Sequence, residues 1–467
     1  MKPEELAITD IPLKTSSGMN NSRNLTEGSI VKNLLYLSWP MIISDTLNTI
    51  GPTIDMLWLG RIGASSIAGV GIAGMVQIIM MLGMWGLNTG LKAMITRAIG
   101  AGDFETPIDI ARQAMVVGFI YTASIGIVIF FFAESLLGLT GVEPDVIREG
   151  AAYIRIIMIA MIGVSLHMSI EGFMQACGDA VNPMKISIFM RITHVVLAPG
   201  LIFGWWIFPR LEVRGAALAQ VLSMVVAVGI GLFYVFSGRT AIRLNMRNFR
   251  IDSGTMWRLL KIGIPASLNG LQKRLGRFVL MLFIVPFGTI PVAAYTLIER
   301  IEMFISTPCF GLARASSILV GQNLGALKPE RSEKSAWTAL GFAESVVIIF
   351  SVLIFLWPET TARIFSSDLK LIETTSAYLR VVVIGLITIG FEKVFMESLA
   401  GAGDTMAAMI INLASTWLIT IPLSYILTRY TGLGVFGIWW AIVAGLLLGS
   451  SAYLIYFWNG KWKHKKI

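Results

Sequence analysis

The chain is 467 residues long, with 55% hydrophobic and only 14% charged residues, and its mean hydropathy is +0.74. This composition excludes a soluble globular domain and predicts a polytopic membrane protein. The net charge of +9 does not indicate a nucleic-acid partner, because most Lys and Arg residues lie in short connections of one parity, as the positive-inside rule describes. Cys177 and Cys309 lie in apolar runs and the chain has three histidines, so we expect no disulfide framework, metal site or cofactor.

Twelve apolar runs are long enough to cross a bilayer as helices. Residues 1–28 form a polar segment without an apolar core, which predicts a cytoplasmic tail rather than a signal peptide. The even number of spans and the basic connections place both termini in the cytoplasm of a multi-pass plasma-membrane protein. The runs lie near 33–59, 64–91, 108–133, 146–176, 184–208, 215–237, 257–285, 290–320, 335–357, 370–400, 405–428 and 434–458.

The second half of the chain repeats the first. When the chain is laid over itself with Pro40 against Pro265, the halves align without a gap, and further identities include Gly100/Gly325, Tyr153/Tyr378 and Asp179/Asp404. Six helices per half return the chain to its starting side, so the repeats are parallel and related by a pseudo-two-fold axis along the membrane normal. The predicted organisation is an N-lobe at 29–237, a cytoplasmic linker at 238–255, a C-lobe at 256–459 and a basic cytoplasmic tail at 460–467.

The first span carries Asp45, Asn48 and Asp55 within an otherwise apolar run. At about 100° per residue, the three side chains fall within an arc of about 80° on one helix face. A charged side chain at mid-membrane costs about 3 kcal/mol on insertion scales, so such residues are functional candidates. We predict a cation-coupling role for this face.

The C-terminal half has a different set of polar residues. The repeat alignment pairs Asp55 with Leu280 and Asn48 with Lys273. Oppositely charged groups within a few Å of one another offset much of their burial cost, so we expect pairing among these residues. We predict that a substrate cavity is lined by Lys273, Arg277, Tyr295, Glu299, Glu302 and Glu392.

Four glycine-containing turns occupy duplicated positions after even-numbered spans: RAIGAGD at 97–103, QACGDAVNPM at 175–184, LVGQNLGA at 319–326 and LAGAGDTMAAM at 399–409. Together with DMLWLGRIG at 55–63, they resemble the multidrug and toxic compound extrusion (MATE) family of transporters. The resemblance covers nearly the whole chain. It implies two six-helix lobes that export organic solutes, commonly cationic and amphipathic, against an inward flow of protons or sodium.

The resemblance also suggests roles for single residues. Asp55 matches the first-helix aspartate that the family associates with cation coupling. In the fifth span, THVVLAP places His194 and Ala198 where one branch of the family has Asn and Asp, so one carboxylate is missing. Sodium prefers several hard oxygen ligands, whereas an Asp/His pair suits protons. Gln220, where the family often has a small hydroxyl residue, is assigned to the substrate cavity.

The sequence therefore predicts a monomeric, membrane-embedded antiporter, not an enzyme, that exports small organic compounds in exchange for protons by alternating access. Three alternatives stay open within transport: sodium coupling, a passive channel, and a flippase for lipid-linked saccharides whose pyrophosphate Lys273 and Arg277 would bind. A membrane-embedded hydrolase is disfavoured, because no nucleophile motif accompanies His167 or His194.

Overall fold

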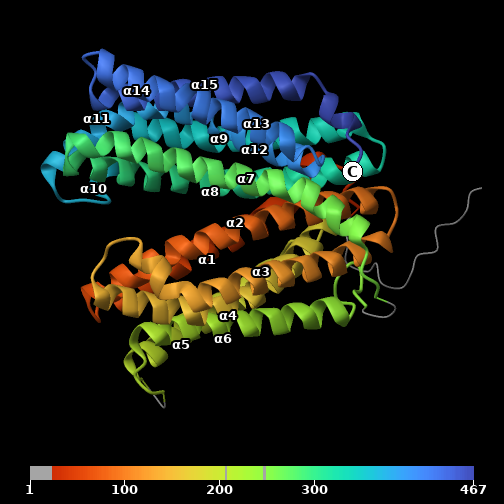
Figure 1. Ribbon diagram of the computed structural model, residues 1–467. Helices are drawn as coiled ribbons and strands as arrows, with labels where there is room; N and C mark the ends of the chain where they lie inside the picture. The colour runs from red at the N-terminus through yellow and green to blue at the C-terminus, as the bar shows by residue number, and fades with distance from the viewer. Residues whose placement is uncertain (1–23, 206–207, 246–248) are drawn as a thin grey trace, which may run out of the picture.

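The computed structural model describes residues 24–205, 208–245 and 249–467, and these residues form a helical bundle in two lobes (Figure 1). Most of the predicted N-terminal tail and a short part of the predicted linker lie outside the described residues. The N-lobe contains α1 (Ile30–Leu59), α2 (Ala64–Gly100), α3 (Thr106–Gly138), α4 (Pro144–Ala176), α5 (Val181–Phe203) and α6 (Glu212–Phe236). The C-lobe contains α7 (Ser253–Ile284), η1 (Val285–Phe287), α8 (Thr289–Gly325), α9 (Pro329–Leu356), α10 (Pro358–Arg363), α11 (Leu369–Leu386), α12 (Ile389–Gly401), α13 (Thr405–Leu413), η2 (Ala414–Thr420), α14 (Ile421–Tyr430) and α15 (Val435–Trp458), followed by η3 (Lys461–His464).

The helices make up the twelve predicted spans, with one interruption that the sequence pattern did not predict. The run predicted at 370–400 is broken between α11 and α12. Glu344 of α9 accepts a hydrogen bond of 2.9 Å from the backbone N–H of Phe391, in the first turn of α12. A helix N-terminus has backbone donors without intrahelical partners, so a carboxylate there stabilises the break.

Nine spans among the described residues are long and apolar enough to cross a membrane by composition alone. The three that are not are α1, α7 and the broken pair α11 and α12. These helices carry most of the predicted site residues, including Asp55, Lys273 and Glu392. In α1 and α7 the polar residues lower the hydropathy, while α12 is also too short to span a membrane by itself.

We call the end of the molecule that holds the first and last described residues the terminal end. The four glycine-containing turns lie there and share one backbone geometry. In each turn a backbone N–H just beyond the helix donates to the carbonyl five positions earlier, for example from Asp179 to Met174 at 2.9 Å. This bond defines a Schellman cap, which needs a left-handed residue. Gly102, Gly178 and Gly403 supply it, whereas the fourth turn uses Leu327, at φ +57°.

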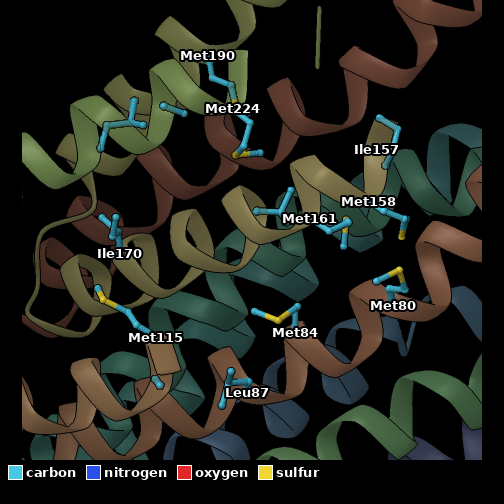
Figure 2. Packing of buried hydrophobic residues seen from close by; sticks show 14 of the residues in the cluster. Met80, Met84, Leu87, Met115, Ile157, Met158, Met161, Ile170, Met190 and Met224 are labelled. Atoms are coloured by element: carbon cyan, nitrogen blue, oxygen red, sulfur yellow. The ribbon is translucent and has the colours of Figure 1, made fainter. Parts of the chain in front are cut away.

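Each lobe has its own apolar core, but the first helix of each half crosses into the other lobe. Leu34, Leu37 and Met41 of α1 belong to the C-lobe core, while Leu259 and Ile262 of α7 belong to the N-lobe core. The N-lobe core is rich in methionine (Figure 2), a flexible side chain that fills irregular gaps between helices. The two halves therefore exchange helix ends around the pseudo-two-fold axis.

The lobes meet most closely at the terminal end, where α2 approaches α8. A Cβ at Gly100 would lie 2.0 Å from the carbonyl oxygen of Gln322, and a Cβ at Gly325 would lie 2.2 Å from that of Arg97. The amide of Gln322 also donates to the carbonyl of Ala176, across the lobe boundary, at 2.8 Å. In Figure 1, α2 and α7 approach each other near the labelled C terminus and diverge toward the opposite end. This conformation is closed at the terminal end.

Candidate functional site

Asp55 and His194 form a buried pair in the N-lobe. Oδ1 of Asp55 on α1 lies 3.2 Å from Nε2 of His194 on α5, and the two side chains are only 7% and 3% exposed. The atoms are at ion-pair distance but are not aligned as a hydrogen bond, so neither of these two atoms has a hydrogen-bond partner among the described residues. Buried polar atoms are normally satisfied, which makes this pair a candidate for function rather than stability.

Three further polar side chains complete what we call the N-lobe polar group, which contains Asp55, Tyr153, Arg191, His194 and Gln220. Arg191 places Nη1 3.3 Å from Nδ1 of His194. Tyr153 on α4 donates its hydroxyl to Oε1 of Gln220 on α6 at 3.4 Å. Both Tyr153 and Arg191 are close enough to Asp55 to interact with its charge. The group thus joins four helices around one carboxylate.

Two further predicted positions lie near this group. Gln220, assigned to the substrate cavity, contacts Tyr153 in the N-lobe polar group and lies apart from the cavity residues predicted in the C-lobe. Ala198, one turn beyond His194, is fully buried, so the missing carboxylate leaves an apolar wall. Sequence reasoning missed Arg191 and the role of Tyr153 in this group. The signal for Arg191 was its spacing of three residues from His194, which places both on one face of α5.

Asp45 and Asp55 do not share a site. Oδ1 of Asp45 lies 2.7 Å from Nη1 of Arg314 on α8, so this ion pair joins α1 to the C-lobe. Ten residues separate the two aspartates, about 15 Å along the helix axis and about 80° around it, which is enough to face different neighbours. Asn48 is exposed between them. Lys92, Glu171 and Glu397 add further charges around the Asp45–Arg314 pair.

The predicted cavity residues of the C-lobe, Tyr295 included, lie around one cavity together with Lys393. We call its charged members the C-lobe charge cluster: Lys273, Arg277, Glu299, Glu302, Glu392 and Lys393. Lys273 of α7 pairs with Glu392 of α12. Arg277 lies 2.9 Å from Oε1 of Glu302 and 3.4 Å from Oε1 of Glu299, both on α8. Tyr295 hydrogen-bonds Glu299.

This cluster lines a cavity of about 150 Å³, whose wall also includes Trp439 on α15. It presents three cations and three carboxylates, and each carboxylate has a cationic neighbour within 4 Å. The cavity is therefore charged but balanced. The N-lobe polar group, in contrast, surrounds a single carboxylate.

Comparisons with known proteins agree with this architecture. A family model described as MatE matches residues 40–199 and again residues 265–426, and the two matches begin at the repeat-related Pro40 and Pro265. The chain is 25% identical over 443 residues to "Probable multidrug resistance protein NorM" of Thermotoga maritima, covering 94% of each chain. It is 27% identical over 447 residues to "FAD transporter" of Shewanella oneidensis, covering 94% of this chain and 96% of that protein.

The fold is also similar to solved structures. One is the outward-facing conformation of a multidrug resistance MATE family transporter, with a TM-score of 0.86, 25% identity and coverage of 96% of this chain and 98% of that one. The predicted twelve-span, two-lobe helical fold is confirmed. The matched segments span more than half of the chain. This protein is therefore a multi-pass membrane transporter, not an enzyme, and it belongs to the MATE family of multidrug and toxic compound extrusion transporters.

Proposed function

We propose that this protein exports organic compounds across the plasma membrane in exchange for protons. The observation that carries the proposal is the buried Asp55–His194 pair at 3.2 Å, whose facing atoms have no hydrogen-bond partner among the described residues. Intramembrane carboxylates with such partners mark ion pathways. Both termini are taken to be cytoplasmic, in keeping with the basic connections, and the transporter is taken to act as a monomer.

Proton coupling is favoured over sodium coupling by the atoms around Asp55. A sodium site needs several oxygen ligands, and the N-lobe polar group places an imidazole and a guanidinium beside the Asp55 carboxylate. Its two other side-chain oxygens, on Tyr153 and Gln220, are hydrogen-bonded to each other. The permanent positive charge of Arg191 repels a second cation, whereas a proton binds directly to a carboxylate oxygen. The site chemistry therefore suits protons.

The proposed cycle uses two states of the lobes. In the described conformation the terminal end is closed by the glycine contacts of α2 and α8, and the Asp45–Arg314 pair joins α1 to the C-lobe farther along the helix. Protonation of Asp55 from outside removes the negative charge of the one carboxylate in the N-lobe polar group. Neutralisation favours substrate release and the return to a cytoplasm-open state. The reason is that a buried, desolvated carboxyl group is more stable when neutral, whereas a carboxyl group in contact with water is more stable when charged.

The C-lobe cavity is proposed as part of the substrate path. Its aromatic wall and paired charges suit amphipathic organic compounds, cations among them. The three lysine and arginine side chains also support a second candidate, a carrier of phosphate-bearing compounds or lipid-linked saccharides. The relative named as an FAD transporter is a reason to include anions in any substrate panel.

The test is transport into liposomes that contain the purified protein. Cationic, zwitterionic and anionic compounds are presented under an imposed pH gradient, and separately under a sodium gradient at fixed pH. We expect uphill movement driven by the pH gradient, and its loss in Asp55→Asn. Sodium dependence at fixed pH, or full pH-driven transport by Asp55→Asn, would overturn the proposed coupling, and purely downhill movement would indicate a channel.

A further inference from the structure

Arg191 makes a contact that fixes where the proton of His194 resides. A guanidinium has donors only, so its Nη1, 3.3 Å from Nδ1 of His194, must donate to that nitrogen. A neutral imidazole that accepts at Nδ1 carries its proton on Nε2. Nε2 is the atom that faces Asp55. The order along the group is therefore guanidinium, neutral imidazole, carboxylate.

The guanidinium reaches this position because residue 51 has no side chain. A Cβ at Gly51 would lie 1.7 Å from Nη1 of Arg191 and 2.2 Å from Cζ. Gly51 precedes Asp55 by one helical turn, so both lie on the same face of α1. One helix, α1, thus provides both the space for the guanidinium at Gly51 and the carboxylate of Asp55.

The internal repeat shows that the arginine is particular to the N-lobe. The repeat alignment relates Gly51 to Gly276 and Arg191 to Thr416. A Cβ at Gly276 would lie 2.4 Å from Cγ2 of Thr416. In both halves a side chain therefore lies close to the glycine, and in the half with Asp55 that side chain is a cation.

We propose that Arg191 is a positioning residue that keeps His194 neutral, so that Asp55 alone binds the transported proton. A proton added to Nδ1 of His194 would point at the N–H groups of Arg191, inside a group where His194 is 3% exposed. Arg191 also interacts with the charge of Asp55, but among the described residues its hydrogen-bond contact within the group is to Nδ1 of His194 and not to the carboxylate. Among the described residues, the other titratable group shown to interact with the pair is Tyr153 of α4, while α6 presents the uncharged Gln220. This inference rests on the proposed role of Asp55.

The direct test is ¹⁵N NMR of the imidazole rings. The chain has only three histidines, so ring-labelled protein in nanodiscs gives few signals, and His194→Asn assigns the one of interest. We expect His194 to remain a neutral Nε2–H tautomer from about pH 5 to 8, the range in which an unperturbed imidazole changes charge. In Arg191→Gln it should titrate within that range, and in Arg191→Lys it should stay neutral. The proposal would be overturned if His194 titrated in the unmodified protein, or if it did not titrate in Arg191→Gln.

Two further variants guard against a folding defect. Gly51→Ala leaves Arg191 in the chain but displaces its guanidinium, so His194 should titrate there as well. Arg155→Gln removes an arginine of α4 whose guanidinium pairs with Glu134 at 3.1 Å, and it should leave the His194 signal unchanged. A His194 signal that stays neutral in Gly51→Ala, or titrates in Arg155→Gln, would contradict the role of Arg191.

The pH profile of transport separates this inference from the proposed function. Arg191→Gln should add a second titration step to pH-driven transport, and the double variant Arg191→Gln/His194→Asn should lose that step. If Asp55→Asn abolishes coupling while Arg191→Gln leaves the profile unchanged, only the inference about Arg191 fails. If Asp55→Asn transports normally, the proposed function itself fails.

Discussion

Gly51 in the N-lobe faces a guanidinium, and the equivalent Gly276 in the C-lobe faces the methyl group of a threonine. Near this shared contact, the buried polar side chains of the two lobes differ in how they are paired. Among the described residues, the facing atoms of Asp55 and His194 have no hydrogen-bond partner, whereas every carboxylate of the C-lobe charge cluster has a cationic neighbour. The difference suggests that the C-lobe charges contribute to stability and the N-lobe charges to coupling.

Breaking a C-lobe pair should have the largest effect on stability. Lys273→Gln leaves Glu392, which is 13% exposed, with only the more distant Lys393 at 3.7 Å. We expect a loss of about 2–3 kcal/mol in the free energy of unfolding, because an uncompensated buried charge is costly and Lys273 is partly solvated. Thermal unfolding in detergent measures it. The double variant Lys273→Gln/Glu392→Gln should recover much of the loss, and equal losses in the single and double variants would refute the pairing argument.

Filling the two glycine contacts compares the lobes directly. Gly276→Ala places a methyl group against Thr416, a short side chain on a packed helix, and should cost about 1–2 kcal/mol through overpacking. Gly51→Ala meets the far end of a long side chain that can swing away, so its stability cost should be smaller. Chemical or thermal unfolding of the two variants side by side gives the difference. A larger loss for Gly51→Ala would mean that the guanidinium is rigidly held.

A substitution in one of the glycine-containing turns should have a smaller effect on stability, and it should be stabilising. Leu327 adopts a left-handed conformation at φ +57°, where the repeat has Gly102 at φ +79°. Leu327 is 88% exposed, so Leu327→Gly removes backbone strain without losing core packing and should stabilise the protein by about 0.5–1 kcal/mol. The matched variant Gly102→Ala should destabilise it by a similar amount. The shift in midpoint temperature should therefore change sign between the two, and shifts of the same sign would contradict the strain argument.

Asp55→Asn should have the smallest effect on stability, although we expect it to abolish the proposed coupling. Its Oδ1 has no hydrogen-bond partner among the described residues, so neutralising the side chain removes little favourable interaction. We expect a change within about 0.5 kcal/mol, measured with the same unfolding assay. A loss as large as that of Lys273→Gln would show that the N-lobe pair is structural, and the contrast between the lobes would not hold.

The sequence by itself determined the fold class, the twelve spans and the duplication. Long apolar runs can cross a bilayer only as hydrogen-bonded helices, and the gapless alignment of the two halves is visible without coordinates. It also selected Asp55 and His194, because polar residues are rare inside spans and stand out against them. The break between α11 and α12 was not visible, because residues 381–391 around it are mostly apolar and the Glu344 carboxylate that caps α12 comes from another helix.

Only the tertiary structure decided which charges meet. Helical periodicity placed Asp45 and Asp55 on one broad face, yet one pairs with α8 of the C-lobe and the other with α5 of the N-lobe, because α1 crosses between the two cores. The same limit hid Arg191 and the contact of Gln220 with Tyr153. Spacing along a helix fixes the direction of a side chain, while its partner depends on which helix packs there, and that is set by contacts between residues far apart in the chain.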